Sequence, residues 1–323
     1  MNSGRHGSIA KLGRGLQNIL PAVSCLDAIL GLPVLLRPKS KFPVVFLLAP
    51  PRSGSTLTYQ ILTTAYQNYH LTNLGNLLFA MPAFGGWLSE NLCKNKFSAF
   101  KSKQGFVEGL CGEAEGMRFW SHWTGITLDA NTTNFKANKA KKLKNRLEHL
   151  CSEESAFITG YLGHVLAIEE LKLMFPQAVF LYLQRDLLSN AISLYNVSAD
   201  DWYSVKTNSF SEAQSNDRFT QIARQLLDIH SLIIKEKDER FYTLRYETLC
   251  DKPEEVINDF TNFADRQGVF LKRKSSAIPS SFPYQVKVPS ESEINQEQYN
   301  ALKQEISFLD VKVRQEMEKL FKL

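Results

Sequence analysis

The stretch Val44-Val45-Phe46-Leu47-Leu48-Ala49-Pro50-Pro51-Arg52-Ser53-Gly54-Ser55-Thr56-Leu57 decides the fold of this chain. Its apolar first half predicts a buried strand, and its second half is a short turn rich in hydroxyl groups. Apolar residues then recur near helical spacing at Leu57, Ile61 and Ala65, which predicts a helix after the turn. Backbone N–H groups of such a turn and the positive end of the next helix bind anions, and Gly54 lets the backbone approach closely. We therefore predict a phosphate-binding loop over residues 49–56, the phosphate loop.

The phosphate loop differs from that of enzymes that hydrolyse nucleoside triphosphates. Their signature is Gly, four residues, then Gly-Lys-Ser/Thr, whereas this chain has Ala49, four residues, then Gly54-Ser55-Thr56. The lysine is missing and the only cation in the loop is Arg52, so ordinary ATP or GTP hydrolysis is not expected. The order Pro-Arg-Ser-Gly-Ser-Thr resembles the phosphosulfate loop of the sulfotransferases that use 3′-phosphoadenosine-5′-phosphosulfate (PAPS).

A second informative stretch alternates strands with helices. Residues 156–159 predict a strand, residues 164–174 a helix, residues 178–184 a nearly continuous apolar strand, and residues 188–195 another helix. This order implies a parallel sheet with right-handed crossovers, and ligands of such sheets bind beyond the carboxyl ends of the strands. The sequence therefore predicts an α/β fold and places Arg185 at the ligand edge.

Arg185 is predicted to bind a phosphate together with Ser193. The two residues lie eight positions apart, and a helix that begins near Leu187 would present Ser189 and Ser193 along one face. An arginine and a serine hydroxyl that converge on one phosphate form charge-assisted hydrogen bonds with geometric specificity. In the alternative interpretation, Arg185 pairs with Asp186 or another carboxylate, and Ser193 is only a small packing residue.

The arginine-to-serine spacing also resembles the 3′-phosphate motif of the sulfotransferase family, so two motifs agree in order and separation. Residues 241–249, followed by Pro253 and a helical pattern to residue 264, are similar to the family's third recurring strand, its Tyr-Glu-x-Leu turn and its next helix. The resemblance covers residues 42–264. It implies a three-layer α/β/α domain with a central parallel sheet, a P-loop-like sulfotransferase fold, and PAPS as the sulfuryl donor.

The resemblance also implies roles for the matching residues. The phosphate loop would hold the 5′-phosphosulfate, Arg185 and Ser193 would hold the 3′-phosphate, and Tyr246 would lie near the adenine unless it is a core residue. The run Lys272-Arg273-Lys274-Ser275 resembles a late loop that closes over the 3′-phosphate in some members, although a serine replaces its glycine. The cofactor-binding residues predicted in this way are Arg52, Ser53, Gly54, Ser55, Thr56, Arg185, Ser193, Tyr246 and Arg273.

The attacking hydroxyl or amine needs a general base, usually a glutamate or a histidine. The segment after the first helix, where many family members carry a glutamate, has no acid here. We predict Glu115, in a glycine-flanked acidic turn before Trp120 and Trp123, because burial among aromatic walls would raise its pKa toward the working pH. Alternatively, this turn only begins a helix and the tryptophans belong to the core. The predicted catalytic residues are Arg52, Glu115, Glu113 and His164, with His122 as a further candidate.

Composition and charge describe a soluble globular protein, with 323 residues, 44% apolar residues and a net charge of +5. The charge suits an anionic ligand and does not call for nucleic acid. We predict a single sulfotransferase-like domain over residues 41–323 with insertions near 71–146 and 200–217. A helical N-terminal extension over residues 1–40 is predicted to pack on this domain. A short amphipathic helix between Leu16 and Leu30 would pack in the same way or, alternatively, lie on a membrane surface. Prolines and polar residues interrupt residues 16–36, so no transmembrane segment is expected.

Two further patterns bear on the surface and the redox state. The lysine-rich run 136–146 predicts the solvated face of a helix that continues to residue 150, or alternatively a surface for an anionic substrate. The five scattered cysteines predict reduced core thiols, with neither a disulfide nor a zinc site. No carboxylate cluster follows a strand, so no metal is expected. Because no signal peptide is recognised, a cytoplasmic location is expected.

The predicted function is transfer of a sulfuryl group from PAPS to a hydroxyl or amine of a small-molecule, lipid or glycan acceptor. One alternative is a kinase-like phosphotransferase on the same loop, which the missing lysine disfavours. The other is a catalytically inactive protein that binds PAPS or its product 3′-phosphoadenosine-5′-phosphate (PAP).

Overall fold

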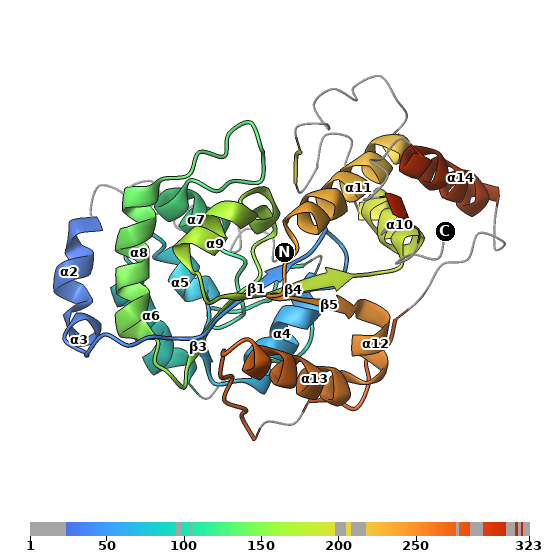
Figure 1. Cartoon of the computed structure of the whole chain (residues 1–323). Helices are drawn as coiled ribbons and strands as arrows, with labels where there is room; N and C mark the ends of the chain where they lie inside the picture. Colours follow the sequence, from blue (N-terminus) through green and yellow to red (C-terminus); the bar gives the residue numbers. More distant parts are fainter. Residues whose placement is uncertain are drawn as a thin grey trace, which may run out of the picture.

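The computed structural model describes residues 24–94, 98–103, 105–197, 205–207, 218–275, 278–284 and 293–307, with residues 314, 315 and 318. A five-stranded sheet in the order β2-β3-β1-β4-β5 forms its centre (Figure 1), and every neighbouring pair is parallel. The predicted parallel sheet is therefore confirmed. The strands are β1 (Val44–Leu48), β2 (Asn68–Tyr69), β3 (Ala156–Thr159), β4 (Val179–Gln184) and β5 (Phe241–Arg245).

Both faces of the sheet are apolar and covered. Alternate residues of a strand point to opposite faces, and the register aligns Phe46 with Phe180 and Phe180 with Phe241. These rings stack in one core cluster, with centroids 5.3 Å and 4.8 Å apart. The neighbours Val45 and Val179 belong to the cluster on the other face. Burial on both faces explains why β1 and β4 are continuous apolar runs in the sequence.

Helices lie on both sides of the sheet, which confirms the predicted three-layer α/β/α architecture (Figure 1). One layer holds α4, α12 and α13, and the other holds α7 to α11 with η2. In the second layer, α14 packs on α10 and α11. The bounds are α4 (Ser55–Ala65), α7 (Met117–Thr124), α8 (Ala137–Leu150), η2 (Leu162–Leu166), α9 (Ile168–Met174), α10 (Leu187–Val197), α11 (Arg218–Glu236), α12 (Tyr246–Asp251), α13 (Pro253–Arg266) and α14 (Glu293–Ser307).

The described end of the N-terminal extension packs beside the second layer. It forms η1 (Ser24–Leu26), α2 (Asp27–Leu30) and α3 (Leu32–Leu35). These elements contact α6 (Pro82–Cys93), which follows α5 (Asn73–Leu77), and α3 also contacts α8. The buried Asp27 carboxylate accepts hydrogen bonds from the Phe84 N–H (3.0 Å) and Arg146 Nε (3.4 Å). Asp27 therefore fixes α2 to both α6 and α8.

Parts of two predicted segments lie outside the described residues, namely residues 1–23 of the extension and most of the insertion 200–217. The predicted helix that continues to residue 150 is confirmed as α8. Within the described part of the chain, no helix has the length and apolar character needed to cross a bilayer.

Candidate functional site

The phosphate loop joins β1 to α4 in a tight turn. Arg52 and Gly54 both have left-handed backbone conformations, with φ of 62° and 93°. Ser53 Oγ donates to the Pro50 carbonyl (2.7 Å), and Thr58 Oγ1 donates to the Gly54 carbonyl (3.1 Å). Left-handed residues of this kind occur in backbone nests that bind anions. Because the first N–H groups of a helix have no intrahelical acceptor, the amides at the start of α4 are available to the same anion.

Gly54 also lies against the ring of Tyr246, the first residue of α12. A Cβ atom at position 54 would overlap this ring, so only glycine fits the observed packing. The first strand and the strand-end tyrosine, which are about 200 positions apart in the chain, therefore meet at the carboxyl edge of the sheet. The Arg185 guanidinium lies over the Tyr246 ring, 5.3 Å from its centroid.

Two side chains from the β4–α10 segment hold the backbone of the phosphate loop. Arg185 Nη1 donates to the Arg52 carbonyl (2.9 Å), and Asn190 Nδ2 donates to the Pro51 carbonyl (2.8 Å). Asp186 caps α10 by accepting from the Ser189 N–H (2.7 Å) instead of pairing with Arg185. Asn190 was missed in the sequence analysis. The signal that could have found it is an amide side chain between apolar residues of α10, at a position that is buried in the structure.

Arg52 and Arg185 give this edge a positive charge. No carboxylate within the described ranges pairs with either guanidinium. Burial and the neighbouring Arg185 charge both lower the pKa of Arg52, because each disfavours its cationic form. Buried polar atoms without hydrogen-bond partners lie at the same edge, among them Arg52 Nε and Asn190 Oδ1. Unsatisfied buried groups of this kind indicate a place for a ligand or water, and the cations fit an anion.

The structure places Ser193 on the side of α10 that carries Asn190, since residues three apart share a helix face. Ser193 is partly buried. Because Asn190 reaches the phosphate loop, the face of α10 that carries Ser193 is the one directed at the loop.

Arg273 does not lie with these residues. It forms a β-bridge with Tyr66, packs on the Tyr66 ring 5.7 Å from its centroid, and pairs with Glu254. Tyr66 follows the last residue of α4, so the 11-residue helix, about 16 Å long, separates Arg273 from the phosphate loop at its other end. The structure therefore does not bring Arg273 together with the other predicted cofactor-binding residues.

Glu115 lies at the carboxyl edge of the sheet, near the end of β3. The Ala114 N–H donates to the Leu71 carbonyl (2.8 Å), and Gly116, with φ of 80°, begins α7. Burial is the main cause of the raised pKa of Tyr59 and of Tyr161; the Glu115 charge raises both pKa values further, and the Glu113 charge has the larger effect on Tyr59. Tyr59 OH in turn donates to the Ile158 carbonyl in β3 (3.3 Å). Burial raises the pKa of Glu115 to about 7, so the carboxyl can accept a proton near neutral pH.

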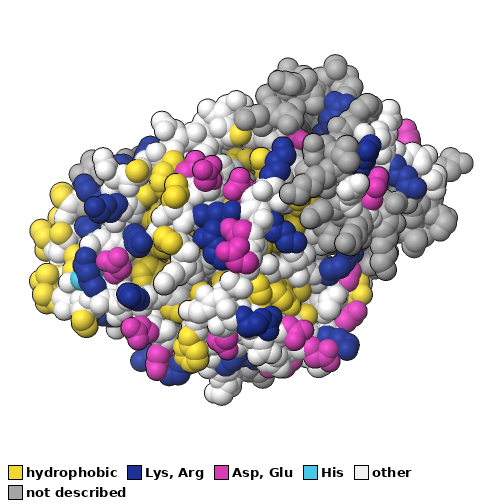
Figure 2. Space-filling model, in the orientation of Figure 1, with side chains coloured by type: hydrophobic (Ala, Val, Ile, Leu, Met, Phe, Trp, Pro, Cys, Tyr) yellow, Lys and Arg dark blue, Asp and Glu magenta, His cyan; other side chains and the backbone are white. Residues whose placement is uncertain are grey.

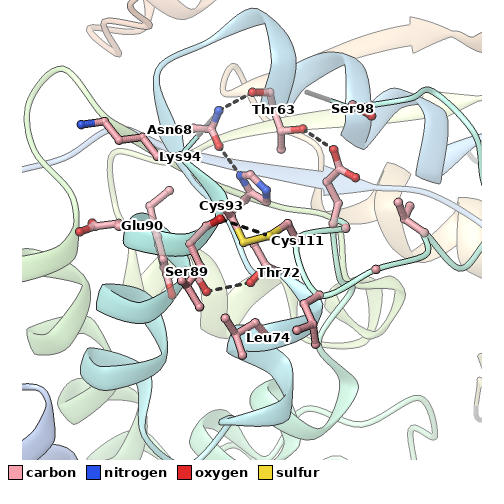
Figure 3. Close-up of a pocket in the computed structure, with 18 of the residues that line it drawn as sticks. Thr63, Asn68, Thr72, Leu74, Ser89, Glu90, Cys93, Lys94, Ser98 and Cys111 are labelled. Atoms are coloured by element: carbon pink, nitrogen blue, oxygen red, sulfur yellow. Dashed lines mark hydrogen bonds between the residues drawn. A yellow bond between two sulfur atoms is a disulfide. The ribbon is translucent and has the colours of Figure 1, made fainter. Parts of the chain in front are cut away.

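Glu113 lies one helical turn farther along α4, on the wall of a cavity of about 1050 Å³. Thr63 Oγ1 donates to Glu113 Oε1 (3.4 Å), and Glu113 forms a β-bridge with Thr72. Figure 3 shows the cavity, with Thr72 Oγ1 bonded to Ser89 Oγ (2.8 Å) and the Cys93–Cys111 bond in its wall. Glu113 thus lines the cavity beside the far half of α4, and Glu115 is not among the residues that line it.

His164 and His122 are poorly placed as bases. His164 is fully buried, with its ring edge-on to Phe46 and Trp120 at centroid distances of 5.0 Å and 4.4 Å. Burial lowers the pKa of His164 to about 3, and neither ring nitrogen has a hydrogen-bond partner among the described residues. For His122, burial and the charges of Lys139 and Lys136 lower the pKa to about 4. The aromatic cage around His164 argues against its predicted catalytic role.

Two of the five cysteines contradict the predicted reduced state. Cys93, the last residue of α6, and Cys111 form a disulfide, with their Cα atoms 5.4 Å apart. The pair was missed because its spacing matches no disulfide or metal motif, and only the fold brings the two thiols together. Cys151 and Cys250 are buried thiols, as predicted, and Cys25 is exposed. No group of three or more metal-ligating side chains occurs within the described residues.

We expect the double substitution Cys93→Ser/Cys111→Ser to lower the free energy of unfolding by about 3 kcal/mol, because the bond closes a loop with a sequence separation of 18. Urea unfolding without reductant measures this loss. Cys25→Ser, at an exposed free thiol, is the control and should leave the midpoint unchanged. Equal stability of the double variant and the parent would mean that the bond does not constrain the chain.

The comparison with family models shows the family of this chain. The chain matches the model of a family described as the "Sulfotransferase family" over residues 43–267, more than half of its length. No curated protein matches it. Among solved structures, it is similar to the sulfotransferase STF9 from Mycobacterium avium (17% identity, TM-score 0.45, 84% of this chain and 70% of that chain). It is also similar to the sulfotransferase STF1 from Mycobacterium tuberculosis H37Rv (15% identity, TM-score 0.45, 89% of this chain and 84% of that chain). A third similar structure is the "Sulfotransferase Domain from the Curacin Biosynthetic Pathway" (12% identity, TM-score 0.41, 82% of this chain and 98% of that chain).

Proposed function

The chain belongs to the sulfotransferase family, and from this premise we propose that it transfers a sulfuryl group from PAPS to a hydroxyl or amine of a small-molecule, lipid or glycan acceptor. The observation that carries the proposal is the meeting of Arg52, Arg185 and Tyr246 at the phosphate loop. The Arg185 guanidinium lies over the Tyr246 ring and donates to the Arg52 carbonyl, and neither arginine has a carboxylate partner among the described residues. This arrangement suits a nucleotide with two anionic ends.

We assign the two ends of PAPS to different elements. Arg52, Ser53, Gly54, Ser55 and Thr56 would hold the 5′-phosphosulfate through loop amides, hydroxyls and one cation. Arg185 and Ser193 would hold the 3′-phosphate, and Tyr246 would contact the adenine. Charge-assisted hydrogen bonds are roughly twice as strong as neutral ones, which supports arginine at both ends.

The transfer itself needs orientation, charge stabilisation and a base. When bound, PAPS supplies the sulfuryl group and a phosphate leaving group. Arg52 and the amides at the start of α4 would stabilise the negative charge that grows on that phosphate. Glu115, with a pKa of about 7, would take the proton of the acceptor as it attacks. No step in this scheme requires a metal ion, and we propose a metal-independent reaction.

The predicted cytoplasmic location remains a prediction. The Cys93–Cys111 disulfide weighs against it, because disulfides persist mainly in oxidising compartments.

Calorimetric titration of the full chain with PAP, adenosine 5′-phosphate and magnesium-ATP tests the function. Tight binding that requires the 3′-phosphate supports the proposal. A preference for magnesium-ATP would favour the kinase-like alternative, and PAP binding without turnover on a broad acceptor panel would favour an inactive binding protein.

Arg185→Ala should weaken PAP by roughly 10- to 150-fold more than adenosine 5′-phosphate, since a hydrogen bond to a charged group is worth about 1.5–3 kcal/mol. Loss of the bond to the Arg52 carbonyl should weaken both ligands alike. The readout is the ratio of the two dissociation constants. Arg273→Ala is a matched control, because Arg273 pairs with Glu254 at the far end of α4, and it should change neither constant. Equal weakening of both ligands by Arg185→Ala would refute the assignment of the 3′-phosphate.

A further inference from the structure

Exposed apolar side chains concentrate on the short helices of the N-terminal extension. Large apolar residues of a folded chain are normally covered, and a contiguous exposed group marks an interaction surface. Ile29 and Leu36 are the most exposed of the group, at 68% and 75%. The group, here the α2–α3 surface, comprises Leu26, Ile29, Leu30, Leu32 and Leu36.

Only two side chains in this segment point firmly inward. Val34 is fully buried in the core, and Asp27 is bonded to Phe84 and Arg146. These contacts, with Leu35 packed partly buried against the core, hold the two helices against α6 and α8, while the five residues of the α2–α3 surface stay exposed. The rigid attachment means that the apolar side chains are presented outward together.

Basic residues border the α2–α3 surface, and Figure 2 shows hydrophobic and Lys/Arg side chains gathered at the left edge, where α2, α3 and α8 lie in Figure 1. Arg146 pairs with Asp27, so this side of α8 faces α2. Lys142 and Lys139 precede Arg146 by four and seven residues and therefore share its side of the helix. Both lysines are exposed, and neither pairs with a carboxylate among the described residues.

The chain after α3 adds to this border. Lys41 is exposed, and Lys39 lies beside it with a single partner, Glu148 (3.3 Å). The only acid of residues 24–36 is Asp27, which is buried and paired. The border is therefore cationic, without exposed acids in α2 or α3 to offset it.

We propose that the α2–α3 surface docks the protein peripherally on an anionic phospholipid bilayer. Apolar side chains of this kind insert at the boundary between headgroups and acyl chains, and anionic lipids attract nearby lysines. A second copy of the chain fits less well, because joining two such surfaces would bring two lysine borders together. An anionic bilayer offers acyl chains to the apolar side chains and negatively charged headgroups to the lysines that border them.

Co-sedimentation of the full chain with vesicles tests the proposal. Vesicles of phosphatidylcholine mixed with phosphatidylglycerol should bind the chain, and pure phosphatidylcholine should bind it at least roughly tenfold more weakly, since each lysine near an anionic surface contributes about fivefold. Ile29→Ser/Leu36→Ser should lower the partition coefficient by at least about tenfold. Lys139→Ala/Lys142→Ala should lower it by roughly 25-fold and reduce its dependence on salt.

Matched controls lie in the opposite helix layer. Phe270→Ser removes an apolar side chain that is 60% exposed, and Lys252→Ala/Arg266→Ala removes two exposed cations of α12–α13. Neither should change vesicle binding. Absence of binding to anionic vesicles, or equal losses with the controls, would overturn the proposal. So would a dimer in light scattering that Ile29→Ser/Leu36→Ser converts to a monomer without changing vesicle binding.

Discussion

Glu115→Gln should lower kcat by about 10²- to 10⁴-fold, the usual contribution of a general base, and should leave the affinity for PAP unchanged. The glutamine keeps the size of the side chain and removes only its ability to take a proton. The effect should appear in kcat because Glu115 is proposed to act on the acceptor, whereas Arg185 and the phosphate loop are proposed to hold PAP. Steady-state kinetics with PAPS and any turned-over acceptor, together with PAP titration, separate the two quantities.

The pH dependence gives a second readout for Glu115. Burial raises its pKa to about 7, and a base works only when deprotonated, so kcat of the parent should rise through neutral pH and level off above it. The Glu115→Gln variant should lose this rise. The free energy of unfolding should fall as pH rises, whereas kcat rises. The pKa of Glu115 is higher in the folded chain than in the unfolded one, so the stability contributed by protonated Glu115 is present in acid and is lost as pH rises through about 7. The glutamine variant should therefore be relatively more stable in mild alkali.

Two controls decide which group is the base. Glu113→Gln changes the neighbouring carboxylate on the cavity wall, and His164→Leu replaces the caged imidazole with a side chain of similar volume. Both should retain turnover within a few-fold when corrected for folded protein. If Glu115→Gln stays active while either control fails, the base is at the other position.

Gly54→Ala should abolish measurable binding of PAP, a loss of at least about 100-fold, which corresponds to about 2.8 kcal/mol. The added Cβ would overlap the Tyr246 ring, so the loop or the ring has to move away from the position in which both face the nucleotide. The left-handed backbone at φ 93° adds strain of roughly 1–2 kcal/mol for a residue with a side chain. Titration with PAP measures the first effect, and thermal unfolding measures the second.

Gly268→Ala separates strain from overlap. Gly268 also has a left-handed backbone, with φ of 72°, but a Cβ there would meet no atom within 4 Å. This control should lose a similar amount of backbone stability and keep full affinity for PAP. If Gly54→Ala binds PAP as well as Gly268→Ala does, the packing of Tyr246 on the loop is not needed for the nucleotide site.

The sequence predicts the sheet better than it predicts the walls of the site. The strands at residues 44–48, 156–159 and 179–184 are recognisable because burial on both faces leaves nearly uninterrupted apolar runs. The turn between β1 and α4 is recognisable because glycine and small hydroxyl residues separate an apolar strand from a helical pattern; its role in phosphate binding stays a prediction. Features set by local pattern were therefore found.

Features that depend on packing between distant parts of the chain were not predicted from the sequence. The overlap that fixes Gly54 depends on a ring 192 positions away, and the Cys93–Cys111 bond depends on how the insertion folds back on α6. Arg273 was assigned from a short basic run, but its partner Glu254 comes from α13, a contact that no local pattern contains. Residue type and spacing thus place a side chain at a sheet edge, whereas its partners come from the tertiary structure.

The hydrogen bond from Arg185 to the Arg52 carbonyl directly connects the two proposed phosphate subsites, so a movement of Arg185 would change the phosphate loop. An arginine that turned toward a 3′-phosphate would alter its hold on the loop that grips the other end, so occupancy of one subsite would be felt at the other as a coupling free energy. A donor that lacks the 3′-phosphate would then bind less well for two reasons. It would lose the contact with Arg185, and the phosphate loop would keep the conformation that it has without a 3′-phosphate. Recognition of the 3′-phosphate would thus also adjust the loop that holds the phosphosulfate group to be transferred.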